Sequence, residues 1–155
     1  GGHGVISTYM ASDGGLSDIL YIPGGGSRFP ITKDNADQRL NCIKMNGKEV
    51  FKFAVRALVD NSLEVLAAEG LTPDDVTYVI AHQANIRIIQ ATAKRLDMPM
   101  EKVVLTLQDH GNTSAASVPM ALDVAVRDGR VKRGDLLLLE AFGGGLTWGS
   151  ALVRF

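Results

Sequence analysis

The sequence predicts an α/β domain in which helices cover a mixed, mostly parallel five-stranded sheet. Two observations lead to this fold class. Strand-like and helix-like segments follow one another in the order strand, helix, strand, helix, strand, helix, strand, strand. Several of the strand-like segments are near-continuous apolar runs, the pattern of strands that are buried on both faces of a sheet. We expect residues 1–155 to form one such domain, because this length suffices for a sizeable core.

The first predicted strand covers residues 4–12, GVISTYMAS, which are rich in β-branched and aromatic residues and are closed by a turn-forming SDGG. A short extended segment at residues 18–30 is broken by proline and glycine. Residues 27–42 are polar and aperiodic. We therefore expect a surface excursion before the first helix.

The first predicted helix runs through residues 46–70, where apolar residues recur at helical spacing. Asn46 lies three residues before Glu49, an arrangement that resembles a capping box. Gly70 is placed to end the helix, because glycine readily adopts the left-handed conformation at this position.

The remaining elements alternate more regularly. Residues 76–82, VTYVIAH, form a continuous apolar run that predicts a buried strand. The later segments predict a helix at 85–97, a strand at 102–107, a helix at 113–129, and two strands at 135–145 and 146–155. The last two strands are joined through a triple glycine, and we expect them to be antiparallel.

Composition and charge exclude several classes of function. The chain is 46% apolar and 21% charged with a net charge of −1, so it lacks the basic field of a nucleic-acid-binding protein. No apolar run approaches the roughly 20 residues that cross a bilayer, so no membrane span is expected. The single cysteine, Cys42, fits a reducing, cytoplasmic compartment. Three histidines without ligand spacing predict no metal site.

Polar side chains follow two of the predicted strands. His82 ends the apolar run at 76–82, and Asn112 lies in the loop after the strand at 102–107. In open α/β sheets, ligands bind beyond the carboxyl ends of the strands. We therefore expect His82 and Asn112 to converge on one pocket, although a lone histidine here is also compatible with a satisfied, partly buried side chain.

The triple glycine at residues 143–145 has two interpretations. Glycine lets the backbone approach a ligand closely and point an N–H group at it, which can hold a developing oxyanion. It is equally suited to a tight chain reversal between the last two strands. The stretch is not a phosphate loop, because no G-K-[ST] follows it. Ser150 does not lie in the G-x-S-x-G elbow of a serine hydrolase.

Together these features describe an acyl-transfer site whose nucleophile is missing. His82 and Asn112 would supply two hydrogen-bond donors to one carbonyl oxygen. A thioester whose α-carbon becomes a carbanion needs such donors, because negative charge builds on that oxygen as an enolate. A neutral imidazole is a sufficient donor.

Long motifs in the sequence closely resemble the C-terminal half of bacterial β-ketoacyl-acyl-carrier-protein synthase III. They are HQANIRII, HGNTSAASVPMALDVAVRDG, LLLEAFGGGLTWGSALVRF, MNGKEVFKFAV and ISTYMASDGG. The likeness covers nearly the whole chain, except roughly residues 24–40. It implies a thiolase-like fold, in which two similar halves pack together, and a homodimer.

The resemblance also implies an activity, the first condensation of type II fatty acid synthesis. A cysteine takes an acetyl group from acetyl-CoA, and malonyl-acyl-carrier protein is decarboxylated. The resulting carbanion attacks the acyl-enzyme to give acetoacetyl-acyl-carrier protein. The expected partners are acyl carrier protein and a coenzyme A thioester, and no cofactor is expected beyond acetyl-CoA as substrate.

By motif position, the resemblance assigns roles to individual residues. The implied catalytic residues are His82, Asn112 and Gly144. The implied coenzyme A site comprises Gly47, Phe51, Ala84 and Asn85. The implied carrier-protein docking segment comprises Gln83, Ala84, Asn85, Ile86 and Arg87. Arg87 suits this role physically, because an exposed cation would steer an acidic carrier protein.

The chain departs from the family in one respect: the family's nucleophilic cysteine belongs to the N-terminal half. Cys42 is far from both catalytic loops and has no helix N-terminus to lower its pKa, so we interpret it as an ordinary thiol. We expect the chain to be a piece of a longer polypeptide and to be inactive alone. The apolar helix at 113–126 supports this expectation, because in isolation it would expose a large apolar patch.

Two alternatives remain open at this point. A related thiolase-like acyltransferase with another acyl starter or acceptor would share these motifs. An isolated half-domain with no catalysis would also carry them. The presence of a companion polypeptide with a reactive cysteine separates these hypotheses.

Overall fold

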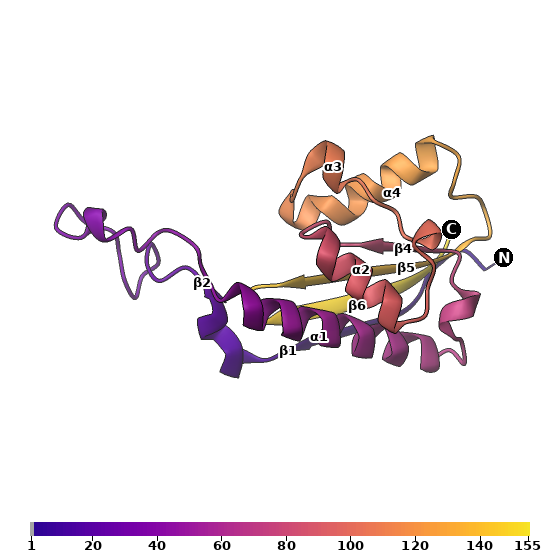
Figure 1. Cartoon of the computed structure of the whole chain (residues 1–155), viewed down its shortest axis with the longest axis horizontal. Coiled ribbons are helices and arrows are strands. Elements are labelled where there is room, and N and C mark those ends of the chain that lie inside the picture. The colour runs from indigo at the N-terminus through magenta and orange to yellow at the C-terminus, as the bar shows by residue number, and fades with distance from the viewer. Residues whose placement is uncertain (1) are drawn as a thin grey trace.

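The computed structural model describes residues 2–155 and places a four-stranded mixed sheet at the centre of the molecule (Figure 1). The strand order is β1-β6-β5-β4. The strands are β1 (Gly4–Ser12), β4 (Tyr78–Ala81), β5 (Leu136–Gly143) and β6 (Thr147–Arg154). β4 and β5 are parallel, whereas β6 is antiparallel to both β5 and β1. The α/β class, the first strand and the terminal hairpin are therefore confirmed.

The expected five-stranded, mostly parallel sheet is wrong on two counts. Within residues 2–155 the central sheet has four strands, and two of its three pairings are antiparallel. The segment at 102–107 contributes only one parallel bridge, between Val103 and Val79. The side chain of Gln83 explains the difference: its Nε2 donates to the Val104 carbonyl and its Oε1 accepts from the Thr106 N–H. This amide satisfies backbone groups that a further strand pairing would otherwise satisfy.

Helices cover both faces of the sheet. α1 (Gly47–Ala67) and α2 (Ile86–Arg95) lie on one face, and α3 (Leu107–His110) and α4 (Ser117–Arg127) lie on the other (Figure 1). Alternate residues of β4 enter the two cores, because Val79 packs with α1 and α2 while Ile80 packs with α4. The predicted burial of this strand on both faces is confirmed.

Local signals explain where α1 begins and ends. Asn46 is its N-cap, and the side-chain Oδ1 accepts the Glu49 N–H at 3.4 Å. The capping box is incomplete, because the Asn46 N–H donates to the Ile19 carbonyl and the Glu49 carboxylate pairs with Lys52. Gly70 adopts φ +66° shortly after the helix, as the sequence predicts.

The segment between β1 and α1 projects from the body of the molecule (Figure 1). Its regular elements are η1 (Gly14–Ile19), β2 (Leu20–Tyr21), η2 (Ala36–Gln38) and β3 (Lys44–Met45), and β2 pairs with β3 at its base. This confirms the expected surface excursion. Large apolar side chains are exposed on it, including Ile22, Phe29 and Ile43.

β1 forms an edge of the sheet and exposes apolar side chains on both faces. Tyr9 is 40% exposed and Met10 is 84% exposed, and as consecutive residues of the strand they point to opposite faces. In α4, Ser117, Ala121 and Ala125 are buried whereas Val126 is exposed, and the expected burial of the helix at 113–126 in the complete enzyme stays a prediction.

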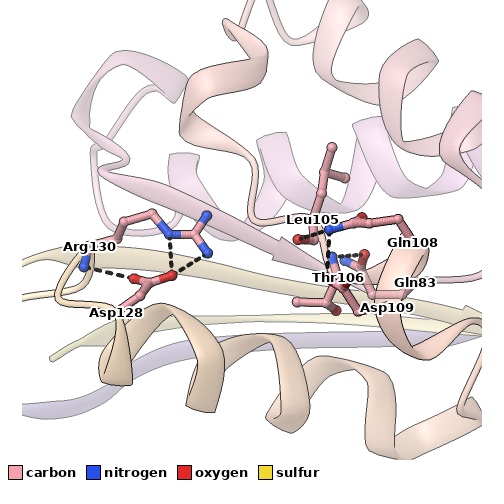
Figure 2. Close-up of polar contacts among 7 residues, drawn as sticks. All are labelled: Gln83, Leu105, Thr106, Gln108, Asp109, Asp128 and Arg130. Carbon is pink, nitrogen blue, oxygen red and sulfur yellow. Dashed lines mark hydrogen bonds and ion pairs between the residues drawn. The ribbon is translucent and has the colours of Figure 1, made fainter.

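Three short 3₁₀ turns complete the chain: η3 (Pro73–Asp75), η4 (Met100–Lys102) and η5 (Ser114–Ala116). After α4, Arg130 forms an ion pair with Asp128, with 2.7 Å between Nη2 and Oδ2 (Figure 2). This side-chain hydrogen bond holds the pKa of Asp128 below its ordinary value.

Candidate active site

A wide cleft opens where β4 and β5 end and the chain turns toward α2 and α4. His82, Asn112 and Gly144 all line it, together with residues from β1, α1 and β6. The cleft has a volume of about 1870 Å³, above the 300–1000 Å³ range typical of small-molecule sites. The predicted convergence of His82 and Asn112 on one pocket is therefore confirmed.

His82 is held in place by the end of the sheet. Its backbone N–H donates to the Glu140 carbonyl of β5 at 2.8 Å, which extends the parallel pairing by one residue beyond β4. Its ring Nδ1 lies 2.5 Å from the Ser117 Oγ at the start of α4. The side chain is half-buried, and burial lowers the pKa of His82 below its ordinary value. The imidazole is therefore neutral near pH 7.

Asn112 reaches the cleft by a different route from the one expected. It follows the short helix α3 and Gly111, and no strand precedes it directly in the described part of the chain. Its side-chain Oδ1 accepts the Ser114 N–H at 3.0 Å. With Oδ1 held by this bond, Nδ2 is available as a donor.

The triple glycine forms the reversal between β5 and β6 and also lines the cleft. The chain-reversal interpretation is confirmed by the pairing of Gly143 with Thr147. Gly145 has φ +148°, and a Cβ atom there would lie 2.7 Å from the Thr147 Cγ2. Glycine is needed at this position for conformation and space alike. The oxyanion role of Gly144 stays a prediction.

The four residues of the implied coenzyme A site also meet in this cleft. Gly47 and Phe51 come from the first turns of α1, and Ala84 and Asn85 come from the loop before α2. Asn85 is the N-cap of α2, and its Oδ1 accepts the Arg87 N–H at 2.9 Å. The structure brings the residues together, and their binding role stays a prediction.

One residue of the implied docking segment requires correction. Gln83 is 0% exposed, so its side chain is not on the surface that a carrier protein would contact. Ala84, Asn85 and Arg87 are exposed and Ile86 is half-buried. The docking interpretation therefore applies only to residues 84–87.

Gln83 instead anchors the loop that carries His82. Its Nε2 donates to the carbonyls of Ala81 at 2.8 Å and Val104 at 3.1 Å. Its Oε1 accepts the Thr106 N–H at 3.0 Å, as Figure 2 shows. One side-chain amide thus joins the end of β4 to the segment before α3. That segment leads to Asn112, so both candidate catalytic loops share this anchor.

Two further residues of interest are absent from the sequence predictions. Ser117 contacts His82 but lies in a small-residue helix start, where a serine gives no distinctive signal. Glu140 is 3% exposed, and burial raises its pKa to about 7, opposed by a hydrogen bond from Ser62. A single acid within the apolar run LLLLEAF is the signal that could have identified it.

Cys42 is exposed and is not among the residues that line the cleft. In residues 2–155, no group of three or more histidine, cysteine, aspartate or glutamate side chains is arranged to hold a metal ion. None of the helices described has both the length and the apolar character that crossing a membrane requires.

Comparison with known proteins reveals similarity to one family. Residues 66–155 match the family described as 3-oxoacyl-[acyl-carrier-protein (ACP)] synthase III C terminal. The chain is 57% identical over 152 residues to a β-ketoacyl-[acyl-carrier-protein] synthase III of Alkalilimnicola ehrlichii, covering 98% of this chain and 46% of the relative. It therefore spans about half the length of the curated relatives it matches.

Solved structures show the same similarity. The crystal structure of 3-oxoacyl-[acyl-carrier-protein] synthase III from Aquifex aeolicus matches with a TM-score of 0.86 and 44% identity, over 99% of this chain and 45% of that one. The priming β-ketosynthase from the R1128 polyketide biosynthetic pathway matches with a TM-score of 0.82 and 34% identity, over 97% of this chain and 44% of that one. The predicted thiolase-like α/β fold is confirmed.

Proposed function

This chain belongs to the 3-oxoacyl-[acyl-carrier-protein] synthase III family as the C-terminal half of such an enzyme, and we propose that it acts in the initiating condensation of type II fatty acid synthesis. The reaction joins acetyl-CoA and malonyl-acyl-carrier protein to give acetoacetyl-acyl-carrier protein and CO₂. The whole of residues 1–155 would form the C-terminal thiolase-like domain. A preceding N-terminal half would carry the nucleophilic cysteine.

One observation carries the proposal. His82 and Asn112 are 30 residues apart in sequence, follow different elements, and still line the same cleft. The neutral state of His82 and the engaged Oδ1 of Asn112 leave each side chain able to donate a hydrogen bond there. Two donors in one cleft are the arrangement that an enolate oxygen requires.

The two donors would act in the decarboxylation step. The bond between the malonyl α-carbon and its carboxylate breaks, and CO₂ leaves. The electron pair stays on the α-carbon and is delocalised onto the thioester oxygen. His82 and Asn112 would hold that oxygen, and removing one such donor typically costs roughly 10²–10³-fold in rate.

The carbon–carbon bond would then form on the cysteine of the other half. The α-carbon attacks the carbonyl carbon of the acetyl-cysteine thioester, and the cysteine thiolate leaves. The Gly144 N–H, at the hairpin beside this cleft, would hold the oxyanion formed during acyl transfer. Without the cysteine half, the chain would be inactive.

The cleft also supports a binding role for thioester substrates. Gly47, Phe51, Ala84 and Asn85 would bind coenzyme A, and the volume of the cleft is ample for so large a ligand. Residues 84–87 would dock acyl carrier protein, with exposed Arg87 attracting its acidic surface. A homodimeric assembly and a cytoplasmic location stay predictions.

A second candidate has the same fold and chemistry but a different substrate. The similarity to a priming β-ketosynthase of a polyketide pathway favours it, because that relative matches over nearly the whole of this chain. The half that precedes this chain would contribute to the acyl pocket, so starter choice depends on residues outside residues 1–155.

The test is mass spectrometry and kinetics on the complete enzyme, with His82→Ala and Asn112→Ala variants. After incubation with acetyl-CoA, we expect one acetyl group on a cysteine of the N-terminal half in every variant. We expect malonyl decarboxylation to be lost in both. His110→Ala is the matched control, because His110 is exposed, lies two residues before Asn112 and does not line the cleft. Equal loss of acetylation in His82→Ala and Asn112→Ala would contradict the assigned roles.

A further inference from the structure

An aromatic cluster of three residues, Phe53, Phe142 and Trp148, joins α1 to the end of the β5–β6 hairpin. The ring centroids of Phe53 and Trp148 are 5.2 Å apart with an interplanar angle of 71°, an edge-to-face arrangement. The ring centroids of Phe53 and Phe142 are 6.0 Å apart with an angle of 44°. Both separations lie within the range of roughly 4.5–7 Å at which aromatic pairs are stabilising. Phe53 therefore contacts two rings of the hairpin at once.

The alternation of side chains along β5 places these rings on the α1 face of the sheet. Leu138 packs in the core beneath α1 and α2, and Glu140 accepts a hydrogen bond from Ser62 of α1. Phe142 is the next residue on that face, because successive residues of a strand point to opposite faces. It pairs directly with Trp148 of β6. The two rings therefore end the buried row of this face at the point where the cleft opens.

The cluster has one side that faces the cleft and one that does not. Phe142 and Trp148 line the cleft, whereas Phe53 is half-buried and is not among the lining residues. The exposed Arg56 lies on the outer side, with its Cζ 5.4 Å from the centroid of the Phe53 ring. Phe53 thus supports the wall of the cleft from behind. Its influence on a ligand would pass through the two rings that it contacts.

The reversal that follows Phe142 has few side chains of its own to fix its place, because residues 143–145 are all glycine. On the β1 side, the Asp13 backbone exchanges two hydrogen bonds with Leu146, at 2.8 and 3.0 Å. On the α1 side, the contacts with Phe53 hold the ring pair from which the reversal begins. The place of this end of the hairpin therefore depends on Phe53 as well as on Asp13.

We propose that Phe53 is a positioning residue that holds the Phe142 and Trp148 rings as a fixed aromatic wall of the substrate cleft. This inference rests on the proposed function. Acetyl-CoA and malonyl-acyl-carrier protein both present the acyl group at the end of a pantetheine arm, a thin chain with apolar methylene groups. A wall that is already ordered binds such an arm without the entropy cost of first fixing two rings. Phe53 thus strengthens the binding of both substrates and takes no part in the chemical step.

The first measurement compares Phe53→Leu with Phe53→Tyr in the complete enzyme. Leucine keeps an apolar side chain but removes the ring, whereas tyrosine keeps the ring. We expect Phe53→Leu to raise KM for both substrates by similar factors of about three to ten, which is what one lost ring pair corresponds to, with kcat unchanged. Phe53→Tyr should keep KM values near those of wild type. Unchanged KM values in Phe53→Leu, or the same increase in both variants, would overturn the inference.

A shorter substrate separates the arm from the rest of the ligand. Acetyl-pantetheine lacks the nucleotide of coenzyme A, so the KM increase in Phe53→Leu should persist with it. An increase seen with acetyl-CoA but not with acetyl-pantetheine would place the effect at the nucleotide and contradict the inference.

Val59→Ala is the matched control for general loosening of α1. Val59 is half-buried on the same helix, packs against the core and does not line the cleft. This variant should lower the free energy of unfolding without raising either KM. A KM increase in Val59→Ala equal to that in Phe53→Leu would show that loss of stability is the cause, and the positioning role would be wrong.

A measurement on wild type decides the matter if Phe53→Leu does not fold. In crystal structures of the complete enzyme with and without coenzyme A, we expect the Phe142 and Trp148 rings to keep their contacts with Phe53. A structure with coenzyme A in which either ring has moved away from Phe53 would overturn the inference.

The two proposals fail separately. If acetyl-CoA does not acetylate wild type, the proposed function is wrong, and this inference falls with it. If acetylation and decarboxylation occur as proposed but Phe53→Leu leaves both KM values unchanged, the proposed function stands and only the role of Phe53 is wrong.

Discussion

The Ser62 hydroxyl donates a 2.8 Å hydrogen bond to the carboxyl group of Glu140, and both residues are buried between α1 and β5. The pair is connected to the candidate site by a backbone hydrogen bond, because the Glu140 carbonyl accepts the His82 N–H. Burial raises the pKa of Glu140 from 4.5 to about 7, and the Ser62 hydrogen bond acts against this increase. The fold therefore favours the protonated acid.

The buried acid predicts a pH-dependent stability. The pKa of Glu140 is higher in the folded state, so its contribution to the free energy of unfolding is fully present below pH 4.5 and is lost as pH rises through about 7. The loss amounts to about 3 kcal/mol. Urea unfolding of the complete enzyme at a series of pH values measures it.

Glu140→Gln tests the source of this dependence. The amide keeps an acceptor for Ser62 but cannot ionise, so we expect a flatter profile between pH 4.5 and 7 and higher stability than wild type at pH 8. Glu64→Gln, on the exposed side of α1, is the control and should keep the wild-type profile. The prediction fails if Glu140→Gln and wild type show the same profile.

Gln83→Ala is expected to destabilise the enzyme by about 3 kcal/mol, because the Val104 carbonyl and the Thr106 N–H would be left buried without their partner. Gln108→Ala is a close control: Gln108 is exposed and its 3.4 Å bond to the Leu105 carbonyl is long (Figure 2). That variant should change the free energy of unfolding by no more than about 0.5 kcal/mol. Equal effects of the two substitutions on chemical denaturation would contradict the anchoring role of Gln83.

Gly145→Ala is expected to lower stability by about 1–3 kcal/mol, because an L-residue is strained at φ +148° and its Cβ would clash with Thr147. Gly143→Ala provides a control within the same triple glycine. Gly143 has no positive φ, and nothing lies within 4 Å of the Cβ that alanine would add. Thermal unfolding of both variants should rank Gly145→Ala clearly below Gly143→Ala, and the reverse order would refute the explanation.

Arg87→Glu is expected to weaken the use of carrier-protein substrate more than the use of acetyl-CoA, and the difference should shrink as salt is added. The physical reason is that Arg87 is an exposed cation in the first turn of α2, beside the cleft. Arg95→Glu reverses an exposed charge at the other end of the same helix, outside the cleft lining, and should affect both substrates little. Steady-state kinetics with each substrate varied in turn decides the matter, and equal losses on both substrates would indicate a folding defect.

Local patterns in the sequence were enough for much of the fold. The extent of β1, the N-cap at Asn46, the burial of β4 on both faces and the β5–β6 reversal depend on short stretches whose side chains determine backbone conformation nearby. The convergence of His82 and Asn112 on one cleft was also predicted, although Asn112 reaches it after α3 and not from the end of a strand.

Tertiary structure alone decided the features that depend on contacts between distant residues. Gln83 forms hydrogen bonds with backbone groups more than 20 residues away, and residues 102–107 keep only one bridge to the sheet. Ser117 meets His82 across 35 residues, and Ser62 meets Glu140 across 78. A buried polar side chain forms hydrogen bonds with whichever groups the packed chain brings within about 3 Å, and periodicity and capping patterns do not predict which groups these are.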